Sequence, residues 1–119
     1  MANRVIKQTA ADLLEHDFAQ ERASALGRLG RRLEAALAAL SAFDAENPRE
    51  AQSNEQRRIR ASLATEASIA LWYFVVQREA CGLRDLRYVL RDYRIPPEVA
   101  ATMGAVPAAP VMPGKRLRR

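Results

Sequence analysis

The sequence has few of the residues on which catalytic and metal sites are built. It contains one cysteine and one histidine in 119 residues. A single cysteine excludes an internal disulfide, and a metal site needs several converging ligands. No Ser–His–acid set, Walker phosphate-binding loop or CxxC pair occurs. We therefore expect His16 to be a surface residue, Cys81 to be an inert thiol, and the protein to be no enzyme and to hold no metal ion or cofactor.

Aromatic residues and strand patterns are also scarce. Aromatic residues make up 6% of the chain, whereas the strong helix formers Ala and Leu dominate. No run of alternating β-branched residues is flanked by turn signals. The sequence thus predicts an all-α fold, and its length leaves room for one domain with a single core.

A signal peptide and a membrane-spanning run are missing from the pattern as well. The first 18 residues hold no apolar signal region. The longest uncharged run, residues 67–76, is about half of the ~20 residues needed to cross a bilayer, and Glu66 and Arg78 flank it. We expect a cytoplasmic protein that does not enter a membrane.

The net charge of +5 is unevenly placed. Residues 1–100 carry 15 Lys and Arg against 14 Asp and Glu. The remaining excess is at the C-terminus, in Lys115, Arg116, Arg118 and Arg119. We expect a helical domain over residues 1–104 and a disordered, Pro-rich basic tail over residues 105–119. Nucleic-acid binding through the tail would be weak and independent of sequence.

The first long helix is predicted over residues 10–44. Thr9 and Asp12 form a capping-box pattern at its start, and leucines and phenylalanines then recur at helical spacing. Gly27 and Gly30 interrupt this pattern. They indicate either close packing of a second helix or the phosphate-clamping GxxG loop of some RNA-binding domains, which would require a sheet.

The second long helix is predicted from Pro48 to Cys81. Asn47 would be its N-cap, with Pro48 at the first position and Glu50 at the third. Gly82 would end it in a left-handed conformation. Its expected core face comprises Ile59, Leu63, Ala67, Ala70, Leu71 and Phe74. Two helices of similar length, about 34 residues each, would form a long antiparallel hairpin.

Two short helices should follow. The first, residues 83–93, would bury Leu83, Leu86, Leu90 and Tyr93, and the second would span residues 98–103. A helix-turn-helix interpretation of residues 83–104 is weak because its second helix offers no Arg, Asn or Gln to base edges.

Bulky residues surround the second helix on every side. Trp72, Tyr73 and Val76 cannot all be covered by one hairpin and two short helices, and an exposed apolar patch of this kind usually marks an interface. A homodimer that completes a four-helix bundle is the simplest way to bury them.

Four arginines recur along the third predicted helix. Arg84, Arg87, Arg91 and Arg94 are spaced so that they share one helical face. This face could bind phosphates or an acidic protein segment, or it could be a solvated face paired with nearby acidic residues. Arg57, Arg58 and Arg60 form a second basic group, for which a solvated patch is the expected interpretation.

The segments QREACG and YRIP, with LGRLGRRLEAALAAL upstream, resemble a family of short bacterial proteins known only as a domain of unknown function. The resemblance spans about residues 10–104 and implies a shared helical fold without implying a chemistry. Gln77, Arg78 and Glu79 within it either belong to a partner-binding site or belong to a helix stop. We expect a non-enzymatic interaction or regulatory module. Alternatives are a nucleic-acid-associated protein and an enzyme built around Glu79, Arg84 and Asp85.

Overall fold

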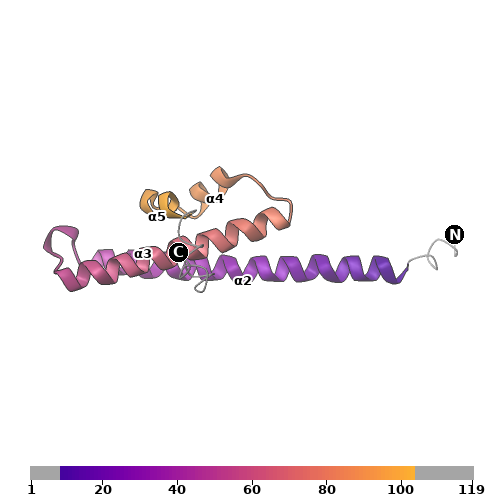
Figure 1. The fold of residues 1–119 in the computed structure, drawn as a ribbon, viewed down its shortest axis with the longest axis horizontal. Helices are drawn as coiled ribbons and strands as arrows, with labels where there is room; N and C mark the ends of the chain where they lie inside the picture. Colours follow the sequence, from indigo (N-terminus) through magenta and orange to yellow (C-terminus); the bar gives the residue numbers. More distant parts are fainter. Residues whose placement is uncertain (1–8, 104–119) are drawn as a thin grey trace, which may run out of the picture.

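The computed structural model describes residues 9–103, and each regular element in that range is helical. The long helices α2 (Ala10–Glu46) and α3 (Asn54–Ala80) form an antiparallel hairpin, with a 3-10 turn, η1 (Arg49–Ala51), between them. The short helices α4 (Leu86–Asp92) and α5 (Pro97–Thr102) lie over α3 (Figure 1). The predicted all-α hairpin with two short C-terminal helices is confirmed. The predicted tail lies outside the described residues.

The helix starts follow from local capping. The Thr9 side chain accepts a hydrogen bond from the Asp12 N–H at 3.2 Å, and the Asp12 carboxylate accepts one from the Thr9 N–H, as predicted. The predicted start of the second helix is wrong. Ser53 and Gln56 form a complete capping box six residues downstream of Asn47, so α3 begins at Asn54. Asn47 instead caps the C-terminus of α2, where its backbone and side-chain N–H groups both donate to the Phe43 carbonyl.

The hydrophobic core lies where α2, α3 and the two short helices meet. Its fully or nearly fully buried members are Leu33, Leu40, Ala67, Ala70, Leu71, Phe74, Val89 and Val99. The predicted face of the second helix is right from Ala67 to Phe74, whereas Ile59 is 41% exposed near the hairpin turn. In α4 the buried residue is Val89. Leu83 and Leu86 are exposed, and Leu90 and Tyr93 are half-buried.

Gly30 permits the closest approach in the hairpin. A Cβ atom placed there would lie 3.2 Å from the Phe74 ring and 3.4 Å from the Tyr93 hydroxyl. Phe74 and Tyr93 themselves pack edge to face, with ring centroids 5.2 Å apart. This packing joins α2, α3 and the end of α4. Gly27 and Gly30 both lie inside α2, so the GxxG loop interpretation is wrong.

The third helix is shorter than predicted, and it lies between two reversals of the chain. Gly82 has a φ of 86° and ends α3: the Leu83 N–H donates to the Arg78 carbonyl at 2.8 Å, as in a Schellman cap. Arg94 has a φ of 51° and ends α4 in the same way, with the Ile95 N–H donating to the Leu90 carbonyl. Only residues 86–92 between these caps are helical.

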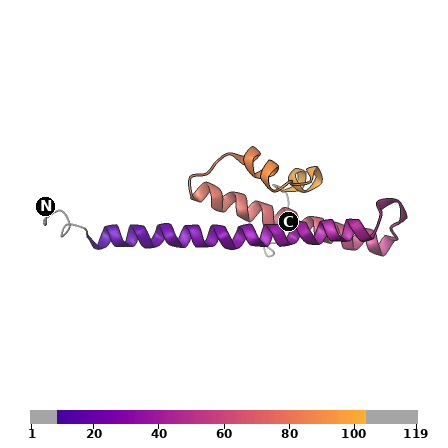
Figure 2. The ribbon, with the colours of Figure 1, turned by 180° about the vertical axis from the view of Figure 1, so that it is seen from behind.

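The two arms of the hairpin differ in length. α2 has 37 residues and α3 has 27. α3 ends beside Arg22, whose carbonyl accepts a hydrogen bond from the Gln77 side chain at 3.3 Å. The preceding part of α2 extends past the end of α3, as Figures 1 and 2 show from opposite sides. We call residues 10–21 the α2 arm. Each of its side chains is exposed, so the prediction of two helices of similar length is wrong.

Candidate interaction surface

Two arginines and one tyrosine form a cluster where α3 meets α4. The Arg78 guanidinium lies 5.9 Å from the centre of the Tyr88 ring and 6.0 Å from that of Phe74. Arg91, one helical turn beyond Tyr88, lies 5.7 Å from the Tyr88 ring. Tyr88 remains 46% exposed. We call Arg78, Tyr88 and Arg91 the arginine–tyrosine cluster.

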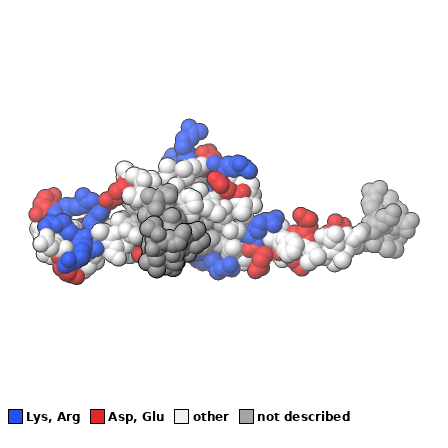
Figure 3. All heavy atoms as spheres, viewed as in Figure 1, with Lys and Arg blue, Asp and Glu red and all other residues white. Residues whose placement is uncertain are grey.

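The predicted row of four arginines is only partly a helical face. Arg87 and Arg91 lie in α4, whereas Arg84 precedes the helix and Arg94 follows it in a left-handed conformation. The prediction of one continuous row is therefore wrong, because α4 is too short to include all four arginines. All four side chains are exposed, and basic side chains stand above α4 in Figure 3.

These arginines are mostly without acidic partners. Arg87 lies 3.9 Å from Asp85, and both side chains are well exposed, so this contact is weak. Within residues 9–103, no ion pair involves Arg78, Arg84, Arg91 or Arg94. In the described chain, the alternative pairing of these arginines with nearby acidic residues is limited to this contact between Arg87 and Asp85. Arg84, Arg87, Arg91 and Arg94 are exposed, and Arg78 is half-buried.

Of the other predicted partner-binding residues, Gln77 makes a contact within the chain and Glu79 is exposed to solvent. Gln77 is engaged with the Arg22 carbonyl, which holds the end of α3 against α2. Glu79 is exposed on the last turn of α3. No side-chain hydrogen bond or ion pair in the described part of the chain joins Glu79 to Arg84 or Asp85.

The predicted dimer-interface residues lie next to the α2–α3 contact. Trp72 and Tyr73 are half-buried, and Val76 is 44% exposed. The Arg32 guanidinium of α2 lies 5.4 Å from the Tyr73 ring, which places this ring beside the outer face of α2. A single chain thus leaves part of this apolar surface uncovered.

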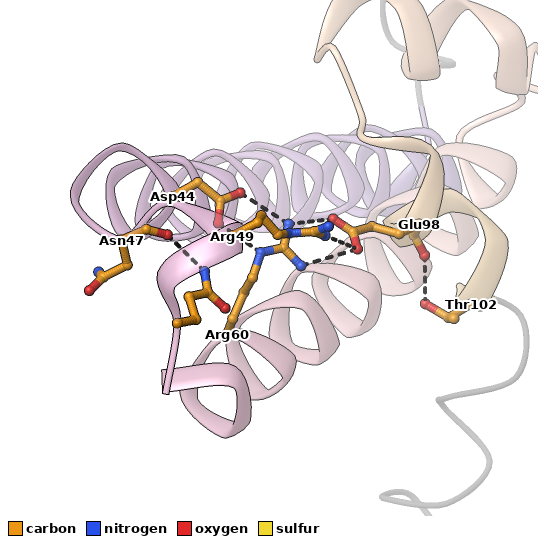
Figure 4. A network of polar contacts seen from close by, with 7 residues as sticks. Asp44, Asn47, Arg49, Arg60, Glu98 and Thr102 are labelled. Atoms are coloured by element: carbon orange, nitrogen blue, oxygen red, sulfur yellow. Dashed lines mark hydrogen bonds and ion pairs between the residues drawn. The ribbon is translucent and has the colours of Figure 1, made fainter. Parts of the chain in front are cut away.

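Arg60 is the centre of a second polar cluster at the closed end of the hairpin (Figure 4). Its Nε and Nη2 donate to the two Asp44 carboxylate oxygens at 2.7 and 3.0 Å. Its Nη1 and Nη2 also donate to Glu98 at 3.1 and 2.5 Å. The Arg60 side chain is only 11% exposed, and Arg49 adds a longer contact to Glu98. α2, α3 and α5 are joined by this one guanidinium, so Arg60 does not belong to a solvated patch.

The electrostatics of this cluster indicate a structural contact. Hydrogen bonds from Arg60 hold the pKa values of Asp44 and Glu98 below their ordinary values. The same two carboxylates raise the pKa of Arg60. At neutral pH the carboxylates are ionised and can only accept hydrogen bonds. An ionised carboxylate has no proton to give as a general acid. The two carboxylates also balance the charge of Arg60, which explains why its side chain can be largely buried.

An open cavity of about 450 Å³ lies beside the Arg60 cluster. Two of the arginines that line this cavity make hydrogen bonds within the chain. Arg49 donates to Glu98, and Arg57 donates to the Gln52 carbonyl and the Asn54 side chain. Within the described range, no buried side-chain nitrogen or oxygen lacks a hydrogen-bond partner. The charged side chains that line the cavity thus already make contacts within the chain.

The remaining candidate residues lie on the α2 arm, at the end of α3 or outside the described residues. His16 is exposed on the α2 arm, and Cys81 is half-buried with its Sγ 3.9 Å from the Arg22 carbonyl. Residues 9–103 contain no group of three His, Cys, Asp or Glu side chains that could hold a metal ion. Lys115, Arg116, Arg118 and Arg119 lie outside the described residues.

The α2 arm is the feature that sequence reasoning missed. Its apolar side chains are unusually open: Leu13 is 60%, Leu14 52% and Phe18 56% exposed. The signal was present in the Ser53–Gln56 capping box, which shortens the second helix and leaves the start of the first without a neighbour. In Figure 3 acidic side chains stand along this projecting part of α2.

α3 is long and apolar enough to cross a membrane by length and composition alone. Only 28% of its most apolar stretch is buried within the chain. The core helix of a hairpin can have the same composition, because Ala67, Leu71 and Phe74 are fully or nearly fully buried against α2. The unburied remainder includes the exposed Val76 as well as polar residues such as Thr65 and Glu66.

Comparison with known proteins adds one finding. The model of a family described as "Family of unknown function (DUF6665)" matches residues 2–111. No curated protein and no solved structure matches the chain.

Proposed function

The chain belongs to the family of unknown function DUF6665, so its role must be argued from its own surfaces, and we propose that it is a small non-enzymatic interaction module. In this proposal it acts as a homodimer in the cytoplasm and binds an acidic segment of a partner protein. The arginine–tyrosine cluster, with Arg84 and Arg87 beside it, is the partner site.

The observation that carries the proposal is the position of two guanidiniums over one partly exposed ring. Arg78 and Arg91 both lie within 6 Å of the Tyr88 centroid, and neither has an acidic partner in residues 9–103. A guanidinium held over an aromatic ring can still donate to a carboxylate through its N–H groups. Holding the side chain in place beforehand also reduces the entropy lost on binding. The cluster is thus suited to bidentate recognition of Asp or Glu.

The homodimer is supported by the apolar surface left open in the single chain. Val76 and the leucine and phenylalanine side chains of the α2 arm are 44–60% exposed. Contiguous apolar surface on a helix usually marks an interface.

A nucleic-acid partner is the second candidate, because phosphate oxygens suit the same free guanidinium edges. The overall charge favours it less. Residues 9–103 contain 13 arginines and no lysine against 14 acidic residues, so the described body is not basic. Non-specific binding to nucleic acid depends on an excess of positive charge.

The two candidates separate in a binding experiment with purified full-length protein. Immobilised wild-type protein is exposed to cell extract with and without nuclease, and retained protein and nucleic acid are measured. We expect the same proteins to be retained in both arms, and Arg91→Glu to lose them. Arg58→Glu is the matched control, since Arg58 is exposed at the far end of α3 and makes only a surface pair with Glu55. Retention that disappears on nuclease treatment would contradict the proposal.

A further inference from the structure

The α2 arm and the segment that follows it have opposite charge. Residues 10–21 contain Asp12, Glu15, Asp17 and Glu21 and no Lys or Arg. Residues 22–33 contain Arg22, Arg28, Arg31 and Arg32 and no acidic residue. No ion pair within the described chain involves any of these eight side chains. Both segments belong to one continuous helix, so they cannot fold back onto each other.

An apolar stripe runs along the same two segments. Leu14, Phe18, Ala25 and Leu29 are separated by four, seven and four residues, which places them on one side of α2. Leu14 and Phe18 are more than half exposed, whereas Ala25 and Leu29 are half-buried near the end of α3. Arg32 and the Tyr73 ring on which it stacks continue this side of the hairpin.

We infer that the partner that covers the α2 arm is a second copy of this chain, with the two α2 helices antiparallel and crossing near Glu21 and Arg22. In this arrangement the acidic arm of each protomer lies along the basic segment of the other. Phe18 then faces the small Ala25 of the partner, and Leu14 faces the partner's Leu29. The inference rests on the homodimer of the proposed function and gives its interface and register.

The geometry of a two-fold axis selects one charged pair. Asp17 and Arg28 are eleven residues apart, which is about three helical turns, so both lie on the same flank of the apolar stripe. A two-fold axis perpendicular to antiparallel helices brings equal flanks together. Asp17 of each protomer therefore faces Arg28 of the other, and the pair occurs twice. Within one chain the two residues are about 16 Å apart along the helix, too far for direct contact.

The test is a double-mutant cycle on the dimer dissociation constant of the full-length protein, measured by analytical ultracentrifugation. Asp17→Arg and Arg28→Asp should each raise the Kd about tenfold, since two attractive pairs become repulsive. The two changes together should raise it far less than the hundredfold that independent effects would give. Neither single change should weaken the helix, because the introduced arginine would lie four residues from Glu21 and the introduced aspartate four residues from Arg32.

Glu15→Arg combined with Arg28→Asp is the matched control. Glu15 is two residues from Asp17 and lies on the opposite flank of α2, so its effect should multiply with that of Arg28→Asp. Far-UV circular dichroism checks that each variant stays helical. A wild-type dimer without coupling between Asp17 and Arg28, or with equal coupling at Glu15, would overturn this register while leaving the homodimer standing. A wild-type protein that remains monomeric would overturn both.

Discussion

The two Schellman caps allow a quantitative test of how backbone conformation ends α3 and α4. A Cβ atom at Gly82 would meet nothing within 4 Å, so substitution by Ala introduces no clash. Its cost comes from holding an L-residue at a φ of 86°. The left-handed conformation costs about 1–2 kcal/mol, and the reduced freedom of the unfolded chain returns part of it. We expect Gly82→Ala to lower the free energy of unfolding by about 1 kcal/mol, and Gly82→Val to lower it more because of its β-branch.

Arg94 provides the complementary substitution. Arg94 has the same role at the end of α4, with a φ of 51°. Arg94→Gly should therefore remove at this position the same kind of backbone strain that Gly82→Ala would introduce at residue 82. We expect it to stabilise the protein by up to about 1 kcal/mol. Urea unfolding followed at 222 nm, at one fixed protein concentration, measures all three variants. Wild-type stability for Gly82→Val, or a clear loss for Arg94→Gly, would refute the reasoning.

Three further predictions concern the arm, the Arg60 cluster and the tail. Phe18→Asp should weaken self-association without loss of helix content, since Phe18 is 56% exposed; size-exclusion chromatography with light scattering at several concentrations measures this. The pKa values of Asp44 and Glu98 are lowered by folding, so their contribution to stability should be complete above about pH 5 and be lost as the pH falls through the folded pKa values. Arg60→Met should flatten this dependence in urea titrations at different pH; an unchanged slope would mean that other groups cause it. Deletion of residues 105–119 should remove salt-dependent binding to DNA in fluorescence anisotropy and leave self-association intact, whereas retained binding would assign it to the arginines near α4.

Features governed by neighbouring residues could be predicted from the sequence. The Thr9–Asp12 capping box and the left-handed Gly82 depend on hydrogen bonds within a few residues, and both occur where expected. The start of α3 differs from the prediction because two signals compete. Asn47 and Pro48 have the composition of a helix start, but Ser53 and Gln56 form a capping box downstream, and Asn47 is used by the end of α2.

Features that depend on helix register could not be predicted in the same way. Arg60 meets Asp44 and Glu98 across 16 and 38 residues of sequence, and no local pattern joins them. The spacing of Arg84 to Arg94 predicts one face only on the assumption of an unbroken helix, which the left-handed Arg94 and the late start at Leu86 interrupt. The α2 arm depends in part on the local Ser53–Gln56 capping box, which shortens α3, and otherwise on where α3 ends beside Arg22.

The mass of the full-length protein in solution tests the central claim most directly. In the proposed assembly, a second copy of the chain covers the exposed α2 arm and α3 surface. Light scattering at micromolar concentration should then give about twice the chain mass of 13.3 kDa. The mass should fall toward that of one chain on dilution and at high salt, because screening weakens the charged contacts. A mass of 13.3 kDa at every concentration would contradict the account.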